Sequence, residues 1–508
     1  MAYGTVLPGS KISTAWMQWV EDSIGTLGSI SECEYLVSVL GADASASKAG
    51  QVIYGGVGDE GGVDGANHAA VINAAITDMG ANGGTMGVRD GTYSLTAKVS
   101  LASAVKLILA RQAIMTLAYD GTMFELSGVT RAGIYGGYLT GVKGTYAAGQ
   151  GIVITATSYR CDVENAYVTN FGARGIDVEA SSQNNIIGNY VYDVDDEGIF
   201  LHESSWNNVQ GNHVNTTGKH GIVSTEGSYN TIANNRVFNA GGNYVAGYAH
   251  GIAVDGNAGA TPCYGNVVNG NVIKTCLMAG IEVADAAHDT VVSSNLIEDT
   301  GDYGLFFGGA LALSHGGIIA GNTLKNVGTG ADQGIMIAGA AVGSKTWGTT
   351  VSGNTVYVAD VDGIRLKYVE YITVSGNTLI GCGGYGLGFE DANADYCNII
   401  GNTFHDNALG GVNVNGANTH GIIRNNIGYV TENSGTDTIA SGTTSKAFAH
   451  GCGYTPTAQD FTITLTENPT NSPGAIWVDT IGAANATVNC ENDPGASNLD
   501  FGWAVRRK

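Results

Sequence analysis

The stretches Ile186-Ile187-Gly188-Asn189-Tyr190-Val191 and Val209-Gln210-Gly211-Asn212-His213-Val214 share one pattern, and its recurrence decides the fold. A β-branched residue stands three positions before an asparagine, and an apolar residue stands two positions after it. The pattern returns with its asparagine at positions 189, 212, 235, 271, 295, 322, 354, 377, 402 and 426, mostly in steps of 23 to 27 residues. A repeat of this length predicts a solenoid whose turns stack on one another.

A second motif, Gly followed by an aliphatic residue, any residue and an apolar residue, alternates with the first. Its glycines are at positions 175, 198, 221, 251, 280, 304, 334, 363, 386 and 411. The two motifs give three aliphatic columns per turn, which predicts short strands stacked in parallel. Asparagine tolerates left-handed bends, and stacked amides can bond along the axis, so we also expect an asparagine ladder.

The composition agrees with an all-β chain. Of 508 residues, 78 are glycine and only 13% are charged, while 44% are hydrophobic, enough for a core. No uncharged apolar run approaches the length of a membrane span. The net charge of −23 argues against nucleic acid and anionic membranes as partners.

The repeat resembles the pectate-lyase-like right-handed β-helix superfamily. This resemblance implies a right-handed, single-stranded parallel β-helix, which we expect to have about a dozen coils. Upstream, Asp64-Gly65-Ala66-Asn67 followed by the Ala-rich segment 68–79 is similar to the entry segment of phage tailspikes, in which a helix caps the first coil. Residues 68–79 have the apolar spacing of a short amphipathic helix.

Three regions are predicted: an N-terminal attachment or assembly segment over residues 1–50, the β-helix over 51–433, and a small antiparallel, β-sandwich-like module over 434–508. The first region contains a predicted amphipathic helix over 13–24, with Trp16 and Trp19 on one face. In the last region, alternation in 461–465 and 501–505 predicts antiparallel strands.

One column of polar residues stands just before the repeat glycines. Residues in the same column of adjacent turns lie about 4.8 Å apart, so side chains distant in sequence become neighbours. Arg174, Glu197, His220 and His250 occupy this column in four consecutive turns. The predicted catalytic residues are Asp195, Asp196, Glu197, His220 and His250, and the predicted substrate-binding residues are Arg174, Asp177, His202, Lys219, Tyr248 and Asp255.

This residue set suits two kinds of chemistry. Stacked carboxylates raise one another's pKa and a nearby histidine can exchange protons with them, which suits cleavage of a glycosidic bond by paired acids. Abstraction of a proton beside a substrate carboxylate by His, Tyr or Lys is the alternative. A polar, solvated column of a β-helix without activity is the third interpretation.

Part of this set is similar to polygalacturonases, which carry an Asp-Asp pair followed one turn later by Gly-His-Gly. Here Asp195-Asp196 is followed by Lys219-His220-Gly221, which implies catalytic roles for the two aspartates and the histidine. The basic Arg-x-Lys pair of that family is missing from the next turn, and Arg365-Leu366-Lys367 lies several turns away.

We expect no cofactor and no metal, with calcium as the alternative. Asp193, Asp195, Asp196 and Glu197 offer the oxygen ligands that calcium prefers, but they match neither an EF-hand nor a nonapeptide repeat. Insertions near residues 239–250, 255–264, 307–316 and 338–349 lengthen some turns and carry aromatic residues that suit binding.

The function expected from the resemblance is that of a virion tailspike-like protein that binds and depolymerises cell-surface polysaccharide. Such a protein would form a homotrimer, attach to a virion through residues 1–50, and have no nucleic-acid or membrane partner. The alternatives are a secreted polysaccharide lyase, glycoside hydrolase or epimerase, and a non-catalytic β-helical adhesin or structural protein. The expected location is the virion or the extracellular space, although residues 1–30 show no basic region followed by the apolar stretch of a signal peptide.

Overall fold

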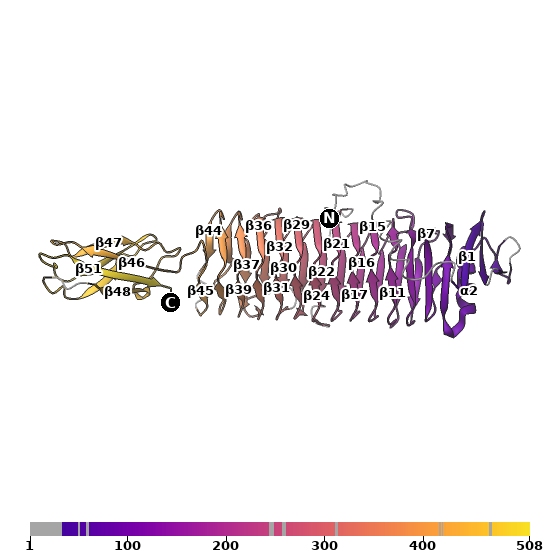
Figure 1. Ribbon diagram of the computed structural model, residues 1–508, viewed down its shortest axis with the longest axis horizontal. Coiled ribbons are helices and arrows are strands. Elements are labelled where there is room, and N and C mark those ends of the chain that lie inside the picture. Colours follow the sequence, from indigo (N-terminus) through magenta and orange to yellow (C-terminus); the bar gives the residue numbers. More distant parts are fainter. Residues whose placement is uncertain are drawn as a thin grey trace. The chain divides into compact units, whose positions relative to one another are not determined.

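The computed structural model describes residues 33–48, 51–56, 60–242, 248–256, 261–309, 313–415, 418, 420–466 and 470–507. The helix predicted over 13–24 and most of the segment 1–50 lie outside this range. The described chain folds as a parallel β-solenoid of about 14 turns, compared with the predicted dozen (Figure 1). It divides into two compact units, Met1–Val291 and Val292–Lys508, which are described separately.

The first unit opens with a strand meander and one α-helix, and then enters the repeating turns. Its elements are β1 (Tyr35–Leu40), β2 (Asp43–Lys48), β3 (Gln51–Gly55), α2 (His68–Met79), the 3-10 helix η2 (Gly80–Asn82), β4 (Gly84–Val88), β5 (Gly91–Leu95), β6 (Val99–Ser100), β7 (Val105–Leu117), β8 (Thr122–Ser127), β9 (Gly133–Thr140), β10 (Gln150–Thr155), β11 (Asp162–Glu164), β12 (Tyr167–Thr169), β13 (Ile176–Glu179), β14 (Asn185–Ile187), β15 (Tyr190–Val194), β16 (Ile199–His202), β17 (Asn208–Gln210), β18 (His213–Thr217), β19 (Ile222–Thr225), β20 (Thr231–Ala233), β21 (Arg236–Ala240), β22 (Ile252–Asp255), β23 (Cys263–Tyr264), β24 (Val267–Asn269), β25 (Val272–Cys276), β26 (Ile281–Ala284) and β27 (Ala287–His288).

The predicted helix forms over the expected residues. The Asn67 side chain caps α2 by accepting a hydrogen bond from the Ala70 N–H at 3.1 Å. The apolar face of α2 packs against β2, β3, β5 and β6 at the start of the solenoid. Among the described residues, no helix has both the length and the apolar character needed to cross a membrane.

Each regular turn contributes three strands, and the strands of successive turns form three parallel stacks. The first stack of this unit contains β10, β13, β16, β19, β22 and β26. The second contains β11, β14, β17, β20 and β24, and the third contains β12, β15, β18, β21 and β25. The three aliphatic columns point inward and are fully buried, as the repeat predicts.

The asparagine ladder is confirmed in atomic detail. The Asn189 backbone N–H and side-chain amide donate to Asn212 Oδ1 at 2.9 and 3.0 Å, and the Asn189 amide also donates to the Val163 carbonyl at 2.8 Å. A second ladder, which the repeat reading missed, runs through Asn184, Asn207 and Asn230. At the bends between strands, some backbone N–H and C=O groups have no hydrogen-bond partner in a sheet. The side-chain amides of the ladders form hydrogen bonds with these groups.

The second unit continues the same three-strand turns and ends in antiparallel sheets. Its elements are β28 (Val291–Ser293), β29 (Leu296–Thr300), β30 (Leu305–Gly308), β31 (Ile318–Ala320), β32 (Thr323–Val327), β33 (Ile335–Ala338), β34 (Thr346–Trp347), β35 (Thr350–Ser352), β36 (Thr355–Ala359), β37 (Ile364–Lys367), β38 (Val369–Glu370), β39 (Thr373–Ser375), β40 (Thr378–Ile380), β41 (Tyr385–Phe389), β42 (Asn398–Ile400), β43 (Thr403–His405), β44 (Gly410–Asn413), β45 (Ile422–Arg424), β46 (Glu432–Ile439), β47 (Ser445–Ala449), the 3-10 helix η3 (Ala458–Asp460), β48 (Phe461–Leu465), β49 (Ile476–Asp479), β50 (Asn485–Cys490) and β51 (Leu499–Arg506).

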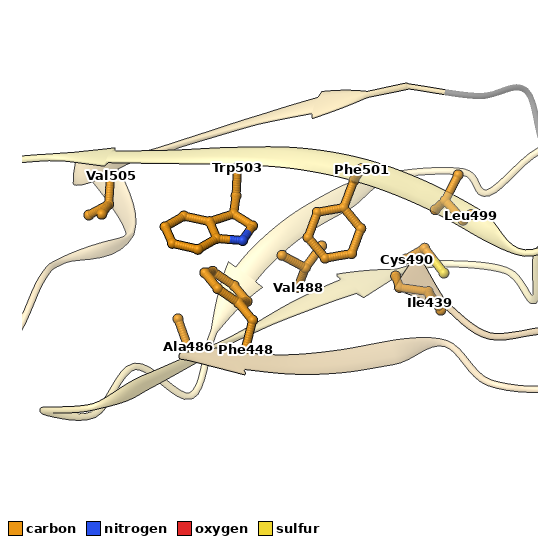
Figure 2. Close-up of a cluster of buried hydrophobic side chains, with 9 residues drawn as sticks. All are labelled: Ile439, Phe448, Ala486, Val488, Cys490, Leu499, Phe501, Trp503 and Val505. Carbon is orange, nitrogen blue, oxygen red and sulfur yellow. The ribbon is translucent and has the colours of Figure 1, made fainter. Parts of the chain in front are cut away.

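The antiparallel module at the C-terminal end has two three-stranded sheets, β46-β51-β48 and β47-β50-β49. Their inner faces enclose one hydrophobic cluster, in which the rings of Phe448 and Trp503 lie 4.7 Å apart (Figure 2). The alternating residues of 461–465 and 501–505 form β48 and most of β51, as predicted. The first strand of the module begins at Glu432.

Candidate functional site

The first stack of the first unit positions the predicted site. Inward residues such as Ile176 and Val178 are buried, so the alternation of a strand turns Asp177 and Glu179 outward. Asp177 lies in register with Phe200 on the next turn, and three turns further the same column holds Glu282. The residues that directly precede the repeat glycines, such as Arg174 and Glu197, stand just before these strands in the sequence. They therefore lie on the same face of the solenoid as the outward residues of the strands, such as Asp177.

Arg174 is the first centre of charge on this face. Its Nε lies 2.9 Å from Glu197 Oε2 and its Nη1 lies 3.0 Å from Asp177 Oδ2, while its guanidinium stacks 3.9 Å from the centroid of the Phe200 ring. Burial lowers the pKa of Arg174, but the two carboxylates outweigh it and the net direction is upward. Burial also raises the pKa of Asp177, against the opposing effect of Arg174.

Lys219 extends this network to the next turn. Its Nζ lies 2.5 Å from Asp196 Oδ1 and 3.6 Å from Glu197 Oε1. Glu197, only 5% exposed, therefore lies between two cations. Burial raises the pKa of Asp196 and the Glu197 carboxylate adds to this, while Lys219 acts in the opposite direction. The net direction of the Asp196 pKa is therefore upward from that of an ordinary aspartic acid.

Two histidines come next: His220 directly follows Lys219, and His250 stands one turn further. The rings of His220 and His250 stack with centroids 5.3 Å apart and planes 14° apart. The His220 Nδ1 accepts the His250 backbone N–H at 3.2 Å, and the His250 Nδ1 accepts the Ala279 N–H at 3.2 Å. Burial, reinforced by the charge on His250, lowers the pKa of His220 to about 3. Because Nδ1 is an acceptor, the neutral His220 ring carries its proton on Nε2 and offers a donor.

Glu282 is a functional candidate that the sequence reasoning missed. Its Oε2 lies 2.8 Å from His250 Nε2. Burial raises the pKa of Glu282, but the contact with His250 outweighs it, so the net direction is downward. The signal was present, because Glu282 occupies in Gly280-Ile281-Glu282 the same position that Asp177 occupies in Gly175-Ile176-Asp177.

Asp255 and Tyr248 lie at the far end of the same face. Burial raises the pKa of Asp255 well above its ordinary range, and the carboxylates of Glu282 and Asp285 reinforce this. Tyr248 is 71% exposed, and its ring centroid lies 6.4 Å from that of His250. The exposed Tyr248 ring therefore borders His250, and Asp255 interacts with the Glu282 carboxylate that contacts the same histidine.

The predicted aspartate pair contacts two different lysines. Asp195 Oδ1 lies 3.2 Å from Lys143 Nζ, which also contacts Asp193 at 2.5 Å, whereas Asp196 faces Lys219. Three of the four acidic residues considered as calcium ligands, Asp193, Asp195 and Asp196, are thus each paired with a lysine ammonium group. Carboxylates bound to lysines offer fewer free oxygens to a cation.

The Arg-x-Lys segment of the second unit forms a charged cluster of its own. Arg365 Nη2 lies 2.7 Å from Asp362 Oδ2, and Lys367 Nζ lies 2.6 Å from Glu390 Oε1. The arginine and the buried aspartate are three residues apart, as Arg174 and Asp177 are. This cluster offers a matched comparison for the arginine of the first unit.

Comparisons with known proteins agree with the fold. The family model "right handed beta helix region" matches residues 128–263, and the model of NosD, a periplasmic copper-binding protein, matches residues 308–448. No curated protein sequence matches the chain. These matches and the observed turns show a right-handed parallel β-helix.

Many solved structures are similar to the chain, three examples being an epimerase module, a tailspike and a catalytic domain. The A-module of mannuronan C-5 epimerase AlgE6 from Azotobacter vinelandii is 16% identical, with a TM-score of 0.52 over 71% of this chain and 94% of its own. A tailspike protein variant of E. coli bacteriophage HK620 in complex with a pentasaccharide is 13% identical, with a TM-score of 0.55 over 86% and 89%. The Agl-KA catalytic domain is 16% identical, with a TM-score of 0.50 over 70% and 64%. At these identities the likeness shows the fold alone.

Proposed function

We propose that this protein binds a cell-surface polysaccharide along the outward face of the first stack, between Arg174 and Glu282, and depolymerises it in a virion tailspike-like role. The observation that carries the proposal is the continuous charged network of Arg174, Glu197, Lys219 and Asp196, followed on the next turns by His220 and His250. Structural neighbours support it, because they include a tailspike with bound pentasaccharide and a mannuronan epimerase.

In this proposal each group has a distinct role. Arg174 and Lys219 bind hydroxyl or carboxylate groups of the sugar, and the Phe200 side chain holds the Arg174 guanidinium in place. Asp196 is the proton donor to the glycosidic oxygen in this proposal, and the upward direction of its pKa favours that role. Glu197, the second carboxylate, takes a proton from the water that attacks the anomeric carbon, while the bond to the protonated glycosidic oxygen breaks and the leaving sugar departs as an alcohol. The His220 ring, neutral at physiological pH, donates a hydrogen bond to the substrate from Nε2.

The role on a virion has two further parts. The protein would act as a homotrimer, and residues 1–50, which lie largely outside the described structure, would attach it to the particle. The location would then be the virion or the extracellular space, which the periplasmic family match and the tailspike neighbour support.

A secreted polysaccharide lyase, hydrolase or epimerase is the second candidate. The observation that favours it is the Glu282 carboxylate, which contacts His250 beside His220 and could accept a proton from a sugar. The molar mass in solution separates the two candidates. A mass of three chains supports the virion role, and a mass of one chain supports the secreted enzyme.

Replacing Arg174 is expected to weaken polysaccharide binding. Arg174→Gln keeps much of the side-chain volume but removes a charged donor, and a charge-assisted hydrogen bond contributes about 1.5–3 kcal/mol. We therefore expect the Kd for the polysaccharide to rise at least about tenfold. The measurement is a binding screen of the full chain against neutral and acidic polysaccharides, followed by titration of the best one.

Arg365→Gln is the matched control, because Arg365 also pairs with a buried aspartate three residues away. It is expected to leave the Kd unchanged. Equal Kd values for Arg174→Gln and the unaltered protein, or binding to no polysaccharide in the screen, would contradict the proposed site.

A further inference from the structure

We propose that His202, Glu203 and Glu226 form a binding site for a divalent transition-metal ion, with zinc the best match. One potential ligand atom from each side chain lies within 4.8 Å of the others. The proposal concerns metal binding at the end of β16 and does not depend on the polysaccharide function.

The turns of the β-helix bring the three side chains together. His202 is the last residue of β16, Glu203 follows it, and Glu226 follows β19 on the next turn. His202 lies in register with Thr225, and the Glu203 N–H donates to the Thr225 carbonyl at 3.0 Å. Residues 203 and 226 both have a left-handed backbone, with φ of 49° and 59°. The two strand ends thus bend in the same way and present their carboxylates beside one imidazole.

The separation of His202 and Glu226 fits two ligands of one ion better than a direct hydrogen bond. His202 Nε2 lies 3.7 Å from Glu226 Oε1, and His202 Nδ1 lies 4.0 Å from Glu179 Oε1. Both exceed the length of an N–H···O hydrogen bond. Two ligands that each bind zinc at about 2.0–2.2 Å are at most roughly 4 Å apart, so the 3.7 Å separation already suits a shared ion.

Two of the three proposed ligands are partly or largely buried, and the third is exposed. The Glu226 side chain is only 11% exposed and the His202 side chain is 32% exposed, so the framework holds both. Glu203 is exposed, and one of its carboxylate oxygens already lies within 4.8 Å of the ligand atoms of the other two residues. The site is therefore largely formed, with one adjustable ligand.

The kinds of ligand select the metal. Calcium and magnesium take oxygen ligands, whereas an imidazole nitrogen with carboxylates suits zinc and neighbouring transition metals. Two carboxylates also balance the charge of a divalent cation. Three protein ligands leave a position for water or another oxygen, as in zinc sites that are not purely structural.

Isothermal titration of the untagged full chain with ZnCl2, in buffer without chelator, tests the proposal. We expect one saturable site per chain, a rise in Tm with zinc, and no comparable binding of CaCl2. His202→Ala and Glu203→Gln are each expected to weaken zinc binding at least about tenfold, since even loss of a group that only orients a ligand costs 10- to 100-fold. Glu203 is exposed, so its variant separates loss of binding from misfolding.

His405→Ala is the control, because His405 is an exposed histidine whose Nε2 lies 3.0 Å from Asp406 Oδ2. It is expected to bind zinc as the unaltered protein does. Absence of a saturable zinc site, or equal zinc affinity in the His202→Ala variant, overturns the proposal.

Discussion

Asp196→Asn is expected to reduce polysaccharide cleavage by at least about 100-fold while leaving binding within a fewfold range. General acid catalysis contributes about 10²- to 10⁴-fold, and an amide cannot supply the proton. The change is nearly isosteric and keeps an oxygen near Lys219 Nζ, so the charged network should remain in place. The measurement is the rate of new chain ends produced from the polysaccharide found in the binding screen.

The pH profile gives an independent check on Asp196. A general acid works only while protonated, so the rate should fall as pH rises through its folded-state pKa. Burial and Glu197 raise that pKa, which extends activity to higher pH than an ordinary aspartic acid allows. The residual activity of Asp196→Asn should lack this limb of the profile.

Asp193→Asn is the matched control for this change. Asp193 contacts Lys143 rather than Lys219, and its φ of 60° is one that asparagine also adopts. It should cleave at the unaltered rate. Cleavage by Asp196→Asn at the rate of the Asp193→Asn control would remove Asp196 from the proposed chemistry.

Asn212→Ala is expected to lower the free energy of unfolding by at least about 3 kcal/mol. Asn212 Oδ1 accepts two hydrogen bonds from Asn189, and its amide donates to the Ile186 carbonyl at 2.7 Å and to Asn235 Oδ1 at 3.0 Å. Each buried group left without its partner costs about 1–3 kcal/mol. The measurements are the urea midpoint and the hydrogen exchange of the Asn189 amide, which should lose protection.

Asn208→Ala is the comparison for the ladder. Asn208 stands on β17 four residues before Asn212 but is partly exposed, so its replacement should change the urea midpoint little. Equal destabilisation by the two substitutions would mean that the Asn212 amide contributes no more than a surface asparagine.

The fold was predictable because each turn repeats the same physical constraints. The aliphatic residues three positions before and two positions after each ladder asparagine must be buried. A shift of the strand register by one residue would turn their side chains outward, so the register is fixed. Helix α2 was predictable for a similar reason, since Asn67 and the apolar spacing of 68–79 are local signals. The second asparagine ladder has the same period, but its column holds asparagine only at positions 184, 207, 230 and 266 and threonine at 290, so its repeat is short.

For the candidate site, the sequence predicted which residues occupy equivalent positions in successive turns, but not which side chains contact one another. Register places Arg174, Glu197, His220 and His250 on successive turns, but it does not fix the direction of a side chain at a bend. Asp195 and Asp196 therefore contact different lysines, one of them Lys143, 52 residues before Asp195. Lys143 belongs to an irregular early turn, so no repeat pattern related it to the acidic run.

Hydrogen–deuterium exchange of the full chain, with and without the polysaccharide it binds best, tests the central claim most directly. If the sugar lies along the outward face of the first stack, protection should increase in peptides covering residues 172–179, 195–202, 218–223 and 248–255. The Arg174→Gln variant should lose that protection, and the Arg365→Gln variant should keep it. Protection confined to the second unit, or spread evenly along the chain, would contradict the assignment of this face as the polysaccharide site.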